Sequence, residues 1–133
     1  MSQENVDVAR RAVDTLNRRD RAGWMATQDP ESECIPSRDW PESDAIRGRE
    51  AVWDFYIAVL GAWREGAFEP VELFEAEDDR VVQQVRAEMQ GKTSGASVVL
   101  SYWTVATFRG GKVLRVEWFA DRDDALEAVG LRA

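Results

Sequence analysis

The chain has 133 residues, of which 44% are hydrophobic and 32% charged, as expected for a globular protein with one domain core. Its net charge of −8 argues against a nucleic-acid-binding surface, because phosphates attract clustered basic residues. The lack of histidine excludes His-ligated zinc or iron and every catalytic triad that depends on an imidazole. We therefore expect one domain over residues 1–133, with no metal site and no cofactor.

The first ten residues, MSQENVDVAR, include two acidic side chains and no apolar stretch of the kind that a secretion signal needs. The longest apolar run, about residues 57–63, is far shorter than the ~18 residues of a membrane span. We expect a cytoplasmic protein with neither a membrane nor a nucleic-acid partner.

Helical periodicity dominates the first half of the sequence. Ser2 can cap a first helix, whose apolar residues at 6, 9, 12, 13 and 16 share one stripe. Asp20 can cap a short second helix. A short strand is expected at residues 31–35 and a loop at 36–47.

The strongest helical pattern begins at Gly48 and carries an apolar stripe through Trp63, so that Gly66 is expected to end the helix. From residue 67 onward the apolar period changes from 3.6 to 2, which predicts strands. These strands are expected at residues 68–75, 80–90, 96–109 and 112–120. Gly110-Gly111 predicts a two-residue hairpin, and Asp121 can cap a terminal helix. Helices early and an antiparallel meander late indicate the α+β class.

The strand at 96–109 is apolar on both faces, although an antiparallel strand with one face in water should alternate. One interpretation is a large sheet buried within a single chain. We favour a second copy that packs sheet against sheet, because few helices are available to cover a second face. The predicted homodimer interface consists of Val99, Trp103, Val105 and Phe119.

Five motifs occur in a characteristic order: LNRRD (16–20), Asp29-Pro30, RGREAV (47–52), RGGKV (109–113) and FADRDDALEAVGL (119–131). Together they resemble the SnoaL-like (polyketide cyclase-like) branch of the nuclear transport factor 2-like superfamily over essentially the whole chain. The resemblance implies a cone: a curved antiparallel or mixed sheet wrapped around a long helix, with two short N-terminal helices and an apolar cavity. It also implies homodimers through the outer sheet face.

The resemblance does not settle the function, because this fold hosts several enzyme activities and non-enzymatic binders. Its catalytic tyrosine would match Ala12 here, and its general-base aspartate would match the segment 34–36. Its oxyanion-stabilising acid would match Thr104, and the late acid of the cyclase branch would match Trp118. Because these positions are all non-acidic, the proton-transfer machinery of the family is not carried over, and the catalytic residues are unknown.

Strand parity predicts which side chains line the cavity of such a fold. Even-numbered residues of the strand at 96–109 would face inward, followed by Leu114, Val116 and Trp118 on the next strand. The predicted ligand-binding residues are Trp24, Cys34, Trp40, Tyr56, Leu60, Tyr102, Thr104 and Trp118. If the parity were reversed, Arg86 and Glu88 would enter the cavity; Glu33 is a further candidate. Trp40 is predicted to pack over the cavity mouth as a lid, and packing on the outer surface is the alternative.

This lining suits a flat, hydrophobic and weakly polar ligand. Our leading hypothesis is a homodimer that binds a small apolar molecule. One alternative is a cofactor-independent lyase, isomerase or epoxide hydrolase that uses tyrosine and carboxylate groups in the same cavity. The other is a dimeric interaction module whose cavity is filled by its own side chains.

Overall fold

The computed structural model describes residues 2–40, 44–61, 63–91 and 95–131. Its helices are α1 (Ser2–Asn17), α2 (Arg21–Ala26), α3 (Arg49–Gly61) and α4 (Arg122–Ala128). Its strands are β1 (Gln28–Ile35), β2 (Ile46–Arg47), β3 (Trp63–Ala76), β4 (Arg80–Gly91), β5 (Ser97–Arg109) and β6 (Lys112–Phe119). No helix among the described residues has both the length and the apolar character to cross a membrane.

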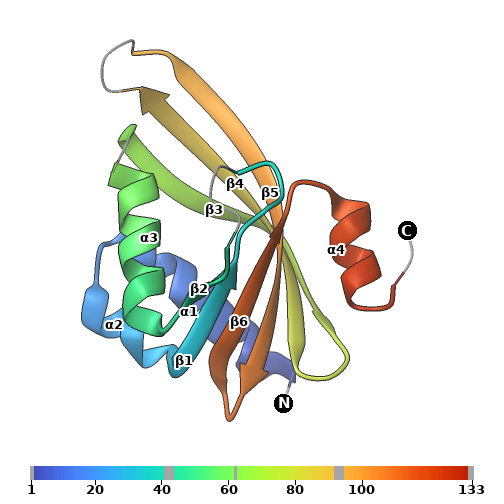
Figure 1. The fold of residues 1–133 in the computed structure, drawn as a ribbon. Coiled ribbons are helices and arrows are strands. Elements are labelled where there is room, and N and C mark those ends of the chain that lie inside the picture. Colours follow the sequence, from blue (N-terminus) through green and yellow to red (C-terminus); the bar gives the residue numbers. More distant parts are fainter. Residues whose placement is uncertain (1, 41–43, 62, 92–94, 132–133) are drawn as a thin grey trace.

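The six strands form one curved sheet in the order β2-β1-β6-β5-β4-β3, as Figure 1 shows. The β1–β6 pair is parallel, and the other neighbours are antiparallel. Helices α1, α2 and α3 lie against the concave face, and α4 lies on the opposite face. This arrangement confirms the predicted α+β class with a curved mixed sheet.

Local sequence signals account for several element boundaries. Asp20 accepts a hydrogen bond from the backbone of Gly23 and caps α2, and Asp121 caps α4 in the same way. Gly110 and Gly111 have φ values of 59° and 78°, which permits the tight predicted hairpin between β5 and β6. The predicted strands after residue 67 and the two capped helices are therefore confirmed, within a few residues at their ends.

Two expectations about helix length are wrong. The helix that begins after Gly48 ends at Gly61, and Trp63 begins β3, because the backbone from Trp63 onward pairs with β4. The first helix, α1, is not short: its 16 residues make it longer than α3, which has 13. Its apolar stripe packs along the concave face for most of that length.

Helix α4 covers part of the outer sheet face within a single chain. Trp103 and Val105 are buried there with Val82 of β4 and Ala125 of α4, and the guanidinium of Arg122 lies 5.6 Å from the centre of the Trp103 ring. The premise that only a second copy could cover these two side chains is therefore wrong. Of the predicted interface residues, Phe119 is half-buried and Val99 remains 52% exposed.

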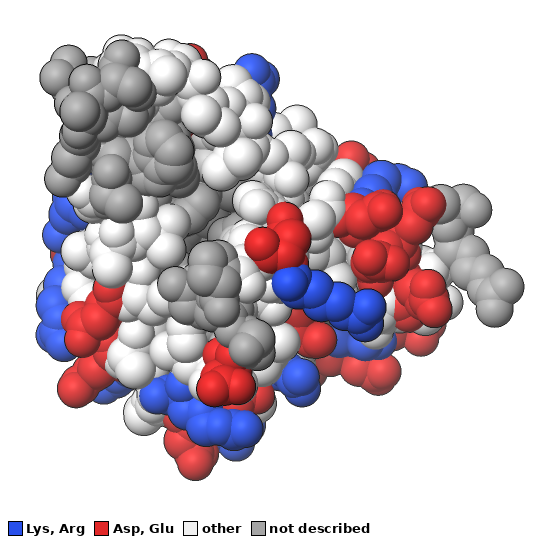
Figure 2. Space-filling model, turned by 45° about the horizontal axis from the view of Figure 1, so that its top comes forward, with Lys and Arg blue, Asp and Glu red and all other residues white. Residues whose placement is uncertain are grey.

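Charged side chains are unevenly distributed over the surface. In the view of Figure 2 they gather along the lower and right-hand parts of the molecule, and the described surface in the upper part is mostly uncharged. The buried apolar residues lie in separate clusters. One fills the concave face, another lies where Val8 and Ala9 of α1 meet that face, and another lies on the outer face beneath α4.

Candidate functional site

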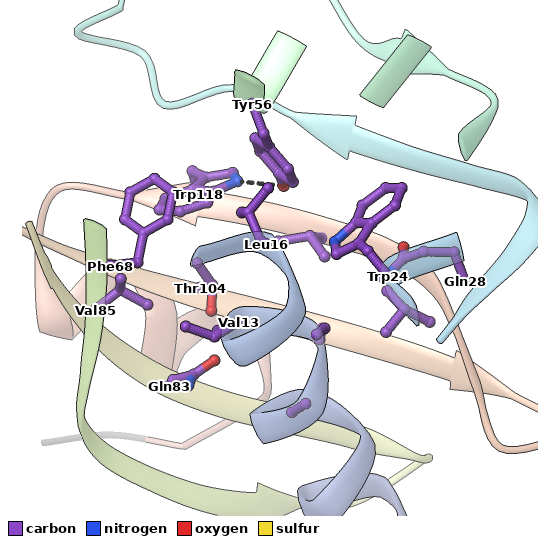
Figure 3. Close-up of a pocket in the computed structure, with 15 residues that line it drawn as sticks. Val13, Leu16, Trp24, Gln28, Tyr56, Phe68, Gln83, Val85, Thr104 and Trp118 are labelled. Atoms are coloured by element: carbon purple, nitrogen blue, oxygen red, sulfur yellow. Dashed lines mark hydrogen bonds between the residues drawn. The ribbon is translucent and has the colours of Figure 1, made fainter. Parts of the chain in front are cut away.

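A small pocket lies between α1 and the concave face of the sheet (Figure 3). Its volume is about 70 Å³, and most of its lining is apolar, including Val13, Leu16, Trp24, Phe68, Val85 and Trp118. A cavity of about 150 Å³ can hold benzene, and pockets for drug-sized ligands reach roughly 300–1,000 Å³. In this conformation the pocket therefore admits only a small group, and a larger ligand requires part of its wall to move.

One polar spot interrupts the apolar lining. Gln83 of β4 and Thr104 of β5 are paired in register, and both side chains are more than nine-tenths buried. In Figure 3 the Gln83 amide and the Thr104 hydroxyl lie next to each other, close to Val13. Nε2 of Gln83 has no hydrogen-bond acceptor among the residues that the structure describes. Such an unpaired buried donor costs about 1–3 kcal/mol, so its retention calls for a reason.

A second glutamine, Gln28 of β1, lines the same pocket, but both polar atoms of its side chain have a hydrogen-bond partner. Its Nε2 donates to Oγ1 of Thr27 at 2.9 Å, and its Oε1 accepts from Oγ of Ser32 at 2.9 Å. Thr27 in turn donates to the backbone carbonyl of Trp24 at 2.6 Å. These buried hydrogen bonds fix the corner between α2 and β1. They already engage the Gln28 amide, so we assign Gln28 a structural role.

A hydrogen-bonded trio forms the wall between the pocket and α3. Nε1 of Trp118 donates to the hydroxyl of Tyr56 at 3.1 Å, and that hydroxyl donates to Sγ of Cys34 at 3.6 Å. Burial raises the pKa of the Cys34 thiol to about 11, against the opposing effect of the hydrogen bonds from Tyr56 and Trp118. Burial, reinforced by Cys34, also raises the pKa of Tyr56 well above its ordinary value. Both groups are therefore neutral near pH 7, so neither acts as a base or a nucleophile.

An aromatic cluster closes the cone beyond Trp118. The ring centre of Trp40 lies 5.3 Å from that of Trp118, 5.2 Å from that of Tyr102 and 6.1 Å from that of Phe55. The adjacent Asp39 accepts hydrogen bonds from Ser37 and, at 3.4 Å, from the hydroxyl of Tyr102. Trp40 therefore packs against Trp118 and Tyr102, and the Asp39 contacts hold its segment against β5.

The structure divides the predicted ligand-binding residues into three groups. Trp24, Tyr56, Thr104 and Trp118 line the pocket. Cys34 and Leu60 are buried behind this lining, and Trp40 and Tyr102 are partly buried at the mouth. On β6, Val113 takes the place in the lining that was expected for Leu114, because the β5–β6 register shifts between Thr107 and Phe108.

The three charged candidates lie outside the pocket. Arg86 and Glu88 are exposed, on the β4 face opposite to Gln83 and Val85, so the reversed parity is wrong. Glu33 has ion-pair contacts with Arg47 at 3.0 Å and with Arg115 at 3.7 Å. Among the described lining residues Tyr56 is the only ionisable one, so the pocket holds no group suited to proton abstraction near pH 7.

Sequence reasoning missed the two glutamines. The signal for Gln83 was available on β4, where inward residues 81, 83, 85 and 87 read Val, Gln, Val, Ala: a single polar residue interrupts an apolar face. Gln28 gave no such signal, because it falls just before the strand that was predicted to begin at residue 31. Within the described part of the chain, no three carboxylate or thiol groups are placed to hold a metal ion.

The family model described as "SnoaL-like domain" matches residues 9–116. The chain belongs to this family. The match includes Gln28, Gln83 and Thr104 and ends just before Trp118. It confirms the resemblance that the sequence motifs indicated. No curated protein matches the chain.

Solved structures with this fold carry varied descriptions. A putative SnoaL-like polyketide cyclase from Jannaschia sp. CCS1 is 21% identical, with a TM-score of 0.77, over 100% of this chain and 96% of its own. The RV0760c protein of Mycobacterium tuberculosis, solved in complex with estradiol-17β-hemisuccinate, is 16% identical, with a TM-score of 0.76 and coverage of 92% and 97%. A putative isomerase from Bacillus subtilis is 15% identical, with a TM-score of 0.72 and coverage of 96% and 93%. At these identities the likeness establishes the fold alone.

Proposed function

We propose that this SnoaL-like protein binds a small, mostly apolar molecule in the pocket between α1 and the concave sheet face. The observation that carries the proposal is the buried amide of Gln83, a residue that lines this apolar pocket and whose Nε2 has no acceptor on any described residue. A glutamine at this position weakens the empty protein, and a ligand that accepts its hydrogen bond would recover that cost.

The fold comparison supports the same class of function. One structural neighbour, RV0760c, was solved with estradiol-17β-hemisuccinate, so a chain of this fold can hold a molecule of that kind. The aromatic lining of the present pocket, with Trp24, Phe68 and Trp118, suits an apolar ligand of smaller size.

Trp40 limits the size of that ligand. Its ring packs against Trp118, Tyr102 and Phe55 and is not among the described residues that line the pocket. A displacement of Trp118 therefore also disturbs its contact with Trp40. We infer that Trp40 acts as a plug, which a larger ligand displaces from the mouth.

Binding of two uncharged probes tests the proposal. Ethylbenzene, which exceeds the volume of the pocket in this conformation, should bind the wild-type protein by displacing part of the wall and should change the fluorescence of Trp24 and Trp118, which line the pocket. Nile red, which is larger, should bind Trp40→Ala several-fold more tightly than the wild type, because the plug is gone. Trp40→Phe is the matched control, since it keeps an aromatic ring at the mouth, and it should resemble the wild type.

Failure of both probes to bind wild-type protein and Trp40→Ala would contradict the proposal. It would favour the interaction module with a filled cavity, which the small volume of the pocket also fits. The enzyme alternative gains little from the geometry: the one tyrosine–carboxylate contact among the described residues joins Tyr102 to the exposed Asp39 at the mouth.

We also propose a homodimer, on a smaller surface than the sequence predicted. Helix α4 leaves open the part of the outer face around Val99, beside Glu88 and Arg86, whose opposite charges can pair across a two-fold axis. Light scattering at micromolar concentration should return twice the chain mass of 15.1 kDa, and Val99→Asp should lower it. A wild-type value equal to one chain mass would contradict the dimer.

A further inference from the structure

The pocket also indicates the chemical class of its ligand, and this inference rests on the proposed binding function. We propose that the ligand carries a neutral carbonyl oxygen, which accepts a hydrogen bond from Nε2 of Gln83 while the apolar body of the ligand lies toward Phe68 and Trp118. A plain hydrocarbon would leave the amide unpaired, and a carboxylate would bring an unpaired charge into the pocket.

The hydrogen-bond donors around the pocket indicate where a ligand acceptor would bind. The Tyr56 hydroxyl donates to Cys34 and accepts from Trp118, so both of these donors are committed to the wall. Nε2 of Gln28 is committed to Thr27. Nε2 of Gln83 is the buried donor that the described residues leave without an acceptor.

The position of Thr104 strengthens this assignment. It pairs in register with Gln83, and the Thr104 hydroxyl lies beside the Gln83 amide in Figure 3. A hydroxyl can donate or accept, so it can supply a second hydrogen bond to an oxygen that Gln83 already binds. One carbonyl oxygen has two lone pairs and can accept from both groups.

Charge excludes the anionic version of the same ligand. No lysine or arginine is among the described residues that line the pocket, and the chain carries a net charge of −8. A carboxylate next to Gln83 would lose its water without gaining a cation, which is strongly unfavourable in an apolar site. A ketone or aldehyde loses far less on transfer from water and still accepts the hydrogen bond.

Three probes of similar size test the proposal: acetophenone, which has a carbonyl group, ethylbenzene, which lacks one, and benzoate, which is charged. Gln83→Met removes the amide and keeps the length and volume of the side chain. It should weaken the binding of acetophenone about tenfold and leave ethylbenzene unchanged or tighter. Benzoate should bind the wild type at least tenfold more weakly than acetophenone does.

Gln84→Met is the matched control. Gln84 is the next residue in the chain, but it lies on the outer face, where its side chain donates to Ser101. The control should leave the affinities for all three probes unchanged. The infrared carbonyl band of acetophenone bound to the wild type gives a second readout that needs no variant, and it should shift to lower frequency than in a hydrocarbon solvent.

The outcomes separate this inference from the function on which it rests. Equal effects of Gln83→Met on acetophenone and ethylbenzene, or an unshifted carbonyl band, would overturn the carbonyl assignment while binding itself stands. Benzoate binding as tight as that of acetophenone would overturn the requirement for a neutral ligand. Failure of acetophenone and ethylbenzene alike to bind would contradict the proposed function as well.

Discussion

Two buried glutamines face the same pocket, and they differ in how their amides are paired. Gln28 is 2% exposed and Gln83 is 6% exposed, so neither amide relies on bulk water. Gln28 uses both of its amide atoms in hydrogen bonds, whereas Nε2 of Gln83 finds no acceptor on any residue that the structure describes. The first side chain therefore stabilises the fold, and the second is kept at a cost to the fold, as expected for a group that binds a ligand.

The difference follows from where the two side chains lie. The partners of Gln28 are its sequence neighbours Thr27 and Ser32, so the corner between α2 and β1 satisfies itself locally. Gln83 lies near the start of β4, and α1 presents Ala9, Ala12 and Val13 across the pocket. Apolar side chains on α1 keep the pocket hydrophobic, and they also leave the Gln83 amide without a partner.

Removing the partnered glutamine should have the largest effect on stability. Gln28→Met leaves the buried Ser32 hydroxyl without its acceptor and removes the amide that donates to Thr27. We expect the free energy of unfolding to fall by about 3 kcal/mol, because two buried hydrogen bonds are lost. Urea unfolding followed by circular dichroism measures the change, with Gln84→Met as a surface control within about 0.5 kcal/mol of wild type. A loss no larger than that of the control would show that the Gln28 network is not structural.

The neutral wall beside the pocket predicts a loss of stability at alkaline pH. The Cys34 thiol has a pKa of about 11 in the folded protein because it is buried, and an unfolded thiol ionises near pH 8.5–9. Between pH 9 and 11 the unfolded chain therefore loses this proton while the folded chain keeps it, so stability falls as the pH rises. We expect the wild type to lose about 2 kcal/mol more than Cys34→Ser over this range, since serine does not ionise. Urea unfolding at each pH measures both proteins. A difference in the free energy of unfolding between wild type and Cys34→Ser that stays the same from pH 9 to pH 11 would contradict the expectation.

Removing the unpartnered glutamine should have the smallest effect, and of the opposite sign. Gln83→Met replaces an amide whose Nε2 lacks an acceptor with an apolar side chain of similar size. We expect a gain of about 1 kcal/mol in the free energy of unfolding, measured without any ligand. If Gln83→Met instead destabilised the protein as much as Gln28→Met does, Gln83 would be a structural residue and the contrast between the two amides would disappear.

The sequence predicted the aromatic part of the site better than its polar part. The parity of β5 placed Thr104 toward the pocket, where the structure has it, and Trp40, predicted as a lid, packs against Trp118 and Tyr102. Gln83 was missed, although it is a single polar residue on an apolar strand face; that pattern does not show whether its buried amide has a partner, which depends on the packed structure. The pairing depends on which α1 side chains lie across the pocket, and no local pattern on β4 records that.

The sequence also failed to predict what covers the outer face of the sheet. The apolar faces of β5 were correctly recognised, but their cover was not, because α4 has only seven residues and carries two acidic residues in its first turn. A helix this short carries too little periodic signal to predict that Ala125 and Val129 would bury Trp103 and Val105. The end of α3 at Gly61 likewise depends on the pairing of β3 with β4, which is not a local property.

The most direct test follows the Gln83 side-chain amide itself. In a ¹H–¹⁵N spectrum of the wild-type protein, the two Gln83 Nε2 proton signals are those that disappear in Gln83→Met. Addition of acetophenone should move at least one of them downfield, as hydrogen bonding to an acceptor requires, and ethylbenzene should not. The Gln28 amide signals, already paired with Thr27 and Ser32, should stay in place with both probes. Gln83 signals that respond to neither probe, or equally to both, would contradict the claim that this amide is kept free to bind a ligand carbonyl.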